Sequence, residues 1–165
     1  GNRFYGSPNY VENFIPIKPL LHKINSYPIN ENFIGVHIRR SDNISSIKYS
    51  PTELFIEKMQ FEVSKDSEVK FYLATDSPAE KKQLLKLFPS RIITHDQYKF
   101  DRNQCESIQN AVIDLYCLSN CRKLIGSYWS SFTDTAWQIR GIQKFIIKSN
   151  KLHQRIDENE TSDFR

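Results

Sequence analysis

Two arginines and an aspartate directly follow an apolar stretch that the sequence predicts as a buried strand. The stretch 33–38 is rich in β-branched residues, and Arg39, Arg40 and Asp42 come immediately after it. In an open parallel sheet, residues that follow the strands face the ligand crevice. A guanidinium placed there suits a phosphate or diphosphate, because its planar fork can bond two oxygens and always carries charge. The alternative is a pair of ordinary surface arginines, one of them paired with Asp42.

A serine-rich turn is the second candidate for anion binding. The segment 127–132 (Ser-Tyr-Trp-Ser-Ser-Phe) follows a predicted strand and leads into a helix predicted over 131–139, with Ser131 as its cap. The start of a helix offers free N–H groups and the positive end of a dipole, so this turn could hold a phosphate. Plain helix capping is the alternative for Ser130 and Ser131, and both roles can coexist at adjacent hydroxyls. Trp129 is interpreted as core or as pocket wall.

Three further polar residues lie where such a crevice would form. Asp76 follows a strand predicted over 69–75. Asp114 lies at the margin of the apolar face of a predicted helix, where it is solvated, paired with a lysine, or placed to accept hydrogen bonds from a guanine base. His37 lies inside the first apolar strand and is either a satisfied structural residue or part of the site.

The elements that must position these residues alternate between strands and helices along the chain. Ser50 and Ser77 are predicted helix caps, each with a glutamate three residues on, and 41–49 is predicted as a polar loop. Strands are predicted over 33–38, 69–75, 91–94, 123–127 and 144–148, and helices over about 51–63, 78–88, 105–120 and 131–139. This alternation predicts an α/β fold, a Rossmann-like three-layer α/β/α arrangement with a mostly parallel sheet.

The chain is expected to have three parts. Residues 1–32 form an irregular arm and a short helix, 33–149 form the Rossmann-like domain, and 150–165 form a polar tail.

Composition excludes several classes of protein. The 165 residues carry a net charge of +4, and no Lys/Arg run indicates a nucleic-acid partner. No apolar segment is long enough to be a transmembrane segment. No G-x-G-x-x-G or Walker loop follows the first strand, and no Asp-x-Asp is present to hold a metal on a diphosphate. The cysteines at 105, 117 and 121 are interpreted as buried free thiols, which favours a cytoplasmic protein, or one of the secretory lumen if the chain is part of a longer one.

Three segments, in this order, resemble the α1,6-fucosyltransferase superfamily. They are 35–42 (GVHIRRSD), 72–76 (YLATD), and 111–119 (AVIDLYCLS) followed by the turn 127–132. The resemblance spans about residues 33–141. That group includes core α1,6- and nodulation fucosyltransferases and, more distantly, protein O-fucosyltransferases and bacterial α1,2-fucosyltransferases.

The resemblance implies a fold, a donor and a reaction. In that family this region is the Rossmann-like, C-terminal half of a GT-B glycosyltransferase, which binds GDP-fucose without a metal or other cofactor. The implied reaction is transfer of fucose to a glycan hydroxyl with inversion. Arg39 would be the catalytic residue that holds the diphosphate, and Ser130, Ser131 and Phe132 would bind the phosphates.

The resemblance also gives roles to the remaining candidates. His37 would face the guanine or the ribose, Arg40 and Asp42 would shape the loop of the first motif, Asp76 would line the donor pocket, and Asp114 would read the guanine.

The sequence departs from the family pattern at the general base. Asn43 follows Asp42 where core α1,6 enzymes have lysine, and no acidic residue appears before Glu53. The N-terminal, acceptor-binding half of the family is absent from this sequence. Two alternatives therefore stay open, a GDP-sugar or nucleotide-binding module without transferase activity and, more distantly, a phosphosugar-binding or isomerase-like α/β domain.

Overall fold

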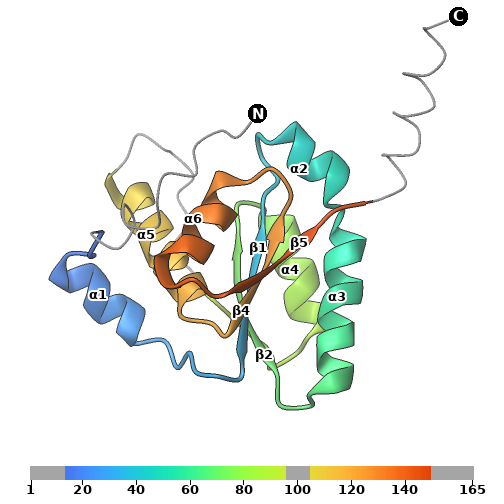
Figure 1. Cartoon of the computed structure of the whole chain (residues 1–165), viewed down its shortest axis with the longest axis horizontal. Helices are drawn as coiled ribbons and strands as arrows, with labels where there is room; N and C mark the ends of the chain where they lie inside the picture. The colour runs from blue at the N-terminus through green and yellow to red at the C-terminus, as the bar shows by residue number, and fades with distance from the viewer. Residues whose placement is uncertain (1–13, 96–104, 150–165) are drawn as a thin grey trace, which may run out of the picture.

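The strands form a single parallel sheet whose order places the first strand at its centre. The computed structural model describes residues 14–95 and 105–149. The strands are β1 (Phe33–Ile38), β2 (Lys70–Thr75), β3 (Ile92–Thr94), β4 (Lys123–Ser127) and β5 (Gln143–Ile147), in the order β3-β2-β1-β4-β5 (Figure 1). Every neighbouring pair is parallel, so the prediction of a mostly parallel sheet is confirmed. The strand order reverses between β1 and β4, which is where ligands bind in such sheets.

Helices cover both faces of this sheet, which confirms the three-layer arrangement. They are α1 (Lys18–Asn25), α2 (Ile44–Tyr49), α3 (Thr52–Lys65), α4 (Pro78–Leu87), α5 (Cys105–Ser119) and α6 (Ser131–Arg140). Figure 1 shows α1, α5 and α6 on one side of the sheet and α3 and α4 on the other. Two separate apolar cores lie between the layers, one on each face.

The side chains of β1 alternate between the two cores. Ile34, Val36 and Ile38 pack in the core that α3 and α4 cover. Phe33 lies in the opposite core, against α5. His37 shares that second face, and its ring contacts α6. This alternation continues past the end of the strand, so consecutive residues after Ile38 start out toward opposite faces of the sheet.

A glycine in β4 lets helix α6 lie directly on the sheet. A methyl group at Gly126 would lie 2.1 Å from Thr133 Cγ2, far inside van der Waals contact. Thr133 is buried in the first turn of α6, and its hydroxyl is hydrogen-bonded to His37 Nδ1 at 2.7 Å. The missing side chain at Gly126 thus sets how closely the start of α6 approaches β1 and β4.

The structure confirms one of the local predictions on loops and helix caps and differs from two others. The predicted loop 41–49 contains helix α2, whose N-cap Asn43 accepts a hydrogen bond from Ser46 N at 2.9 Å. Ser77 caps α4 as predicted. The cap of α6 is Ser130, one residue before the predicted Ser131.

Ser50 is not the cap of α3, contrary to the prediction. Helix α3 begins at Thr52 without a side-chain cap. The buried Ser50 hydroxyl instead donates to the carbonyl of Ile147 at 2.6 Å and accepts from Tyr128 N at 2.8 Å. The hydroxyl therefore joins the end of β5 to the segment after β4, a long-range use that local sequence rules do not predict.

Two of the three cysteines are buried, as predicted, while Cys105 is exposed. Burial raises the pKa of Cys117 to about 12, so this thiol stays protonated and unreactive. Cys121 lies one turn further along and is buried in the same core.

Parts of the predicted outline lie outside the described residues. These are residues 1–13 of the arm, 96–104 of the loop before α5, and the tail 150–165. Within the ranges that the structure does describe, no helix combines the length and the apolar character needed to cross a membrane.

We predict that Gly126→Ala destabilises the fold, because the new methyl group must displace Thr133 and the start of α6. The free energy of unfolding should fall by about 2 kcal/mol, as expected for overpacking in a core. Urea unfolding measures it. Gly35→Ala is the matched control, since a methyl there meets its nearest atoms, side-chain carbons of Leu118 and Leu124, at 3.1 Å and should cost less. Equal losses for the two variants would contradict the close approach at Gly126.

Candidate functional site

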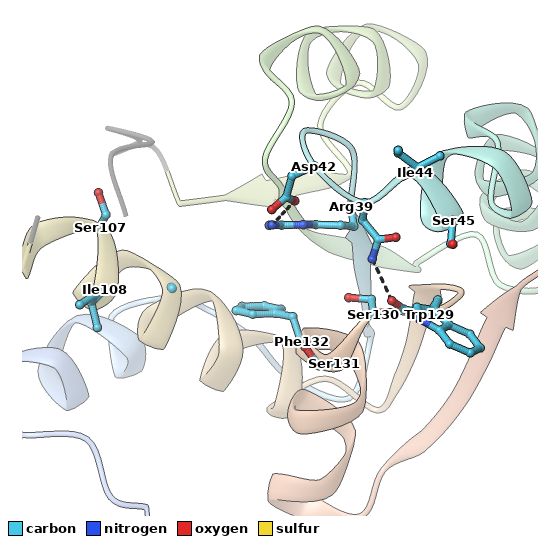
Figure 2. Close-up of a pocket in the computed structure, with 12 residues that line it drawn as sticks. Arg39, Asp42, Ile44, Ser45, Ser107, Ile108, Trp129, Ser130, Ser131 and Phe132 are labelled. Carbon is cyan, nitrogen blue, oxygen red and sulfur yellow. Dashed lines mark hydrogen bonds and ion pairs between the residues drawn. The ribbon is translucent and has the colours of Figure 1, made fainter. Parts of the chain in front are cut away.

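A pocket of about 780 Å³ lies where the segments after β1 and β4 meet. This volume is typical of a small-molecule site. Four segments line it: the segment after β1, the start of α2, the first half of α5 and the start of α6 (Figure 2). The lining residues are Arg39, Asp42, Asn43, Ile44, Ser45, Ser107, Ile108, Ala111, Trp129, Ser130, Ser131 and Phe132. The pocket therefore lies at the point of the sheet where the strand order reverses.

Arg39 lines this pocket and carries a guanidinium. Its backbone N–H donates to Ser127 Oγ at 3.0 Å, which fixes the residue against β4. Its guanidinium is paired with Asp42 and with Asp76 Oδ2, the latter at 3.1 Å. The Asp42 side chain is 49% exposed. The Arg39 side chain is itself 25% exposed, so a ligand oxygen can approach its guanidinium from the solvent side.

The start of α6 supplies the second anion-binding element of the pocket. Ser130 caps the helix and accepts a hydrogen bond from Thr133 N at 3.5 Å. Ser131 and Phe132 are the first residues of the helix, and their N–H groups belong to the turn that lacks intrahelical acceptors. Asp134 in that turn would repel an anion, but it is neutralised by Lys144 Nζ at 2.7 Å. The structure thus places a guanidinium and a helix N-terminus around one pocket.

Asp76 organises the loop after β1 and is absent from the lining of the pocket. Its Oδ1 accepts from Arg40 N at 2.7 Å, and its Oδ2 accepts from the backbone N–H and the hydroxyl of Ser41, at 3.1 and 2.7 Å. With Arg39, four donors of the loop converge on this carboxylate. Asp76 therefore sets the direction of Arg39 from behind, instead of forming the pocket wall that the sequence suggested.

Arg40 turns away from the pocket, unlike its neighbour. Its Nε donates to Glu80 Oε1 at 2.9 Å, and its Nη2 donates to Thr52 Oγ1 at 2.9 Å and to the carbonyl of Ser50 at 3.0 Å. These contacts tie the loop to α3 and α4. The alternation of β1 is the sequence signal for this difference, because Arg40 continues the row of Ile38 while Arg39 continues that of His37.

His37 lies behind the pocket wall. Its ring centroid is 4.7 Å from that of Phe132, which lines the pocket, and its Nδ1 is hydrogen-bonded to Thr133. Burial lowers the pKa of His37 from 6.5 to about 3, with a further lowering by Arg39 that the Asp76 carboxylate opposes. His37 is therefore neutral at physiological pH, and its observed contacts are structural.

Asp114 is buried instead of solvated. It is 4% exposed, and its carboxylate accepts a hydrogen bond from the Tyr72 hydroxyl at 2.8 Å. Burial and this carboxylate raise the pKa of Tyr72 well above its ordinary value, so the hydroxyl remains a donor. Asp114 does not line the pocket, although Ser107, Ile108 and Ala111 of the same helix do.

Sequence reasoning missed the contribution of α2. Asn43 and Ile44 line the pocket, and Asn43 Nδ2 donates to the carbonyl of Trp129 at 2.8 Å. Trp129 lies at the pocket mouth with 70% of its surface exposed. The one available signal for α2 was the asparagine cap, because the six-residue helix is too short for an apolar period.

Among the residues that the structure describes, no group of three or more His, Cys, Asp or Glu side chains is placed to hold a metal ion.

Comparisons with known proteins find fucosyltransferases. No protein-family model matches the chain. The sequence is 31% identical over 120 residues to GDP-fucose protein O-fucosyltransferase 2 of Caenorhabditis elegans. That match covers 71% of this chain and 28% of that protein, so the chain spans less than a third of this curated relative.

Solved fucosyltransferases share the fold. The Bradyrhizobium fucosyltransferase NodZ superposes with a TM-score of 0.55 at 21% identity, over 82% of this chain and 45% of that one. NodZ soaked with GDP-fucose gives 0.53 at 24% identity, over 74% and 42%. POFUT1 in complex with GDP gives 0.57 at 10% identity, over 79% and 46%. The chain therefore shares its Rossmann-like fold with part of each of these fucosyltransferases, and it spans less than half of each of these structures.

We predict that Asp76→Asn loosens the loop after β1. An amide keeps the shape but turns an NH₂ group toward donors that now share the carboxylate, so some of the four part-buried or exposed donors of the loop lose their acceptor. The free energy of unfolding should fall by about 2 kcal/mol, and the amide protons of Arg40 and Ser41 should exchange faster with solvent. Asp134→Asn is the control, because a part-exposed carboxylate with one lysine partner should cost less than about 1 kcal/mol. Unchanged exchange at both amides would contradict this role.

We predict that His37 makes stability depend on pH. Its pKa is lower in the folded state than in the unfolded chain, so between about pH 3 and 6.5 the unfolded state binds more protons. Stability should therefore be complete above pH 6.5 and fall as the pH drops, by up to about 1.4 kcal/mol per pH unit. In urea unfolding between pH 7.5 and 4.5, His37→Asn should show a shallower slope than the natural chain. Parallel slopes would rule out this contribution.

Proposed function

Because this chain is similar to fucosyltransferases in sequence and in fold, we propose that it is the donor-binding domain of a glycosyltransferase that uses GDP-fucose. One observation carries the proposal: the Arg39 guanidinium and the start of α6 line the same pocket, at the reversal of the strand order. This combination suits a diphosphate, because a guanidinium and free N–H groups can neutralise its charge together. The pocket volume of about 780 Å³ is sufficient for a nucleotide sugar.

The proposed reaction is transfer of fucose to a glycan hydroxyl with inversion. The acceptor oxygen attacks C1 of the fucose while the bond from C1 to the β-phosphate oxygen breaks, and GDP leaves with that electron pair. Arg39 and the N–H groups of Ser131 and Phe132 would meet the charge that grows on the diphosphate, which stabilises the transition state more than the bound donor. In this proposal these protein groups, and no metal, carry the charge of the leaving group.

In this proposal the remaining sequence candidates support the donor site indirectly. Asp76 and Arg40 hold the loop that presents Arg39, and His37 supports Phe132. The role of Asp114 in guanine recognition remains a proposal. It would require the guanine edge to reach the buried carboxylate that now binds Tyr72.

A second candidate function is a GDP-sugar-binding module without transferase activity. Asp42 is the one carboxylate among the described lining residues, and it is ion-paired with Arg39, so the described pocket offers no unpaired general base. Slow release of GDP from GDP-fucose, in the presence of a glycan panel, would favour the enzyme. Binding without any release would favour the module.

The compartment is proposed from the thiols. Cys117 and Cys121 are buried and unpaired with each other or with Cys105, which fits the cytoplasm. A secretory lumen is the alternative if the chain is part of a longer protein.

We predict that the chain binds GDP and GDP-fucose and that Arg39 provides much of the affinity. Arg39→Ala should weaken both ligands by about 10- to 100-fold in titration calorimetry, since it removes charged hydrogen bonds to the diphosphate. The affinity of Arg39→Lys should lie between those of the natural chain and Arg39→Ala, because an ammonium keeps the charge but cannot bond two oxygens as the planar guanidinium does. Arg122→Ala, which removes an exposed partner of Asp66, is the matched control and should change nothing. Binding of UDP-fucose but not GDP-fucose would overturn the choice of base.

A further inference from the structure

We propose that Trp129, together with Ile44, forms the subsite for the sugar of the bound nucleotide sugar and selects a 6-deoxyhexose. The inference rests on the proposed function and adds to it the end of the pocket in which the sugar lies. Both side chains line the pocket, and they are among its most exposed apolar residues, at 70% and 80%.

The pocket has two ends on either side of its anion-binding centre. Figure 2 shows Ser130 between Phe132 on one side and Trp129 on the other, with Arg39 above them. A diphosphate held by Arg39 and the start of α6 therefore leaves one end for the nucleoside and the other for the sugar. We assign the Phe132 end to the base, because that ring is backed by the buried ring of His37 at 4.7 Å. The sugar then falls at the open α2 end, where an acceptor can reach it.

The backbone of Trp129 is strained in a way that exposes its ring. Its φ is +59°, in the left-handed region that residues other than glycine rarely adopt. The Asn43 amide donates to its carbonyl at 2.8 Å, and the Ser46 hydroxyl donates to the carbonyl of Tyr128 at 2.6 Å. Residues are held in such conformations chiefly at ligand sites, where the surrounding structure fixes them. Helix α2 thus holds an aromatic ring at the pocket mouth at a cost to the fold.

The chemistry of this end suits a deoxy sugar. A flat indole can pack against the C–H face of a pyranose, as aromatic rings do against other apolar surfaces. The Ile44 side chain lies on the α2 side of the pocket mouth, across from the ring (Figure 2), and would contact a methyl group favourably, whereas a hydroxymethyl group there would lose hydrogen bonds to water. The pair therefore favours fucose over a hexose that carries a hydroxyl at C6.

The test compares GDP with GDP-fucose on the full chain by titration calorimetry. Trp129→Ala should weaken GDP-fucose by about tenfold and leave GDP unchanged, because only the sugar contacts the ring. Trp129→Phe should keep most of the affinity. Trp137→Phe is the matched control, since this second tryptophan packs against Lys144, 4.1 Å from its ring centroid, and lies outside the pocket lining.

A glycine variant distinguishes the loss of the Trp129 ring from a loss of fold stability. Trp129→Gly relieves the left-handed backbone strain, so its melting temperature should equal or exceed that of the natural chain while its affinity for GDP-fucose falls as in Trp129→Ala. Equal weakening of GDP and GDP-fucose would place the base on Trp129 and overturn the inference, as would no weakening of either. Failure of the natural chain to bind both ligands would overturn the proposed function itself.

Discussion

The site depends on one carboxylate, that of Asp76. It belongs to the segment after β2, yet the groups it binds all belong to the segment after β1. The parallel register explains this, because Ile38 pairs with Thr75 and the next residues of the two strands leave the sheet side by side. A loop without secondary structure has backbone N–H groups to satisfy, and Asp76 accepts those of Arg40 and Ser41. The direction of Arg39 is therefore set by the register of two strands.

Most of the architecture was predictable from the sequence because strands and long helices carry strong local signals. The apolar runs of β1, β2 and β4 are buried on both faces of the sheet. Each run is followed by polar residues that mark the end of the strand in the sequence. Ser77 caps α4 as its spacing indicates. Ser50 has the same spacing but serves Ile147 and Tyr128, which lie far along the chain. Helix α2 is held by contacts of the same long-range kind, and no window of sequence contains them.

The candidate site was predictable in its centre and less so at its edges. Arg39 and the turn at Ser130 and Ser131 line one pocket, as their positions after β1 and β4 suggested. Chemistry alone did not distinguish Arg39 from Arg40, because both are arginines at a strand end. Their separation depends on side-chain direction, which the period of the strand encodes. The burial of Asp114 depends on the angle at which α5 packs on the sheet. Asp114 lies at the edge of the apolar face of this helix, and the sequence does not determine whether such an edge residue is buried.

The hydrogen bonds that join α2 to the turn before α6 have a consequence for kinetics. Asn43 and Ser46 donate to the carbonyls of Trp129 and Tyr128, so these hydrogen bonds couple the α2 wall of the pocket to the opposite wall, the turn before α6. Widening the mouth by moving either wall alone would break both bonds. As far as these two described segments are concerned, nucleotide capture should need no separate opening step, and its rate should depend on diffusion and ionic strength.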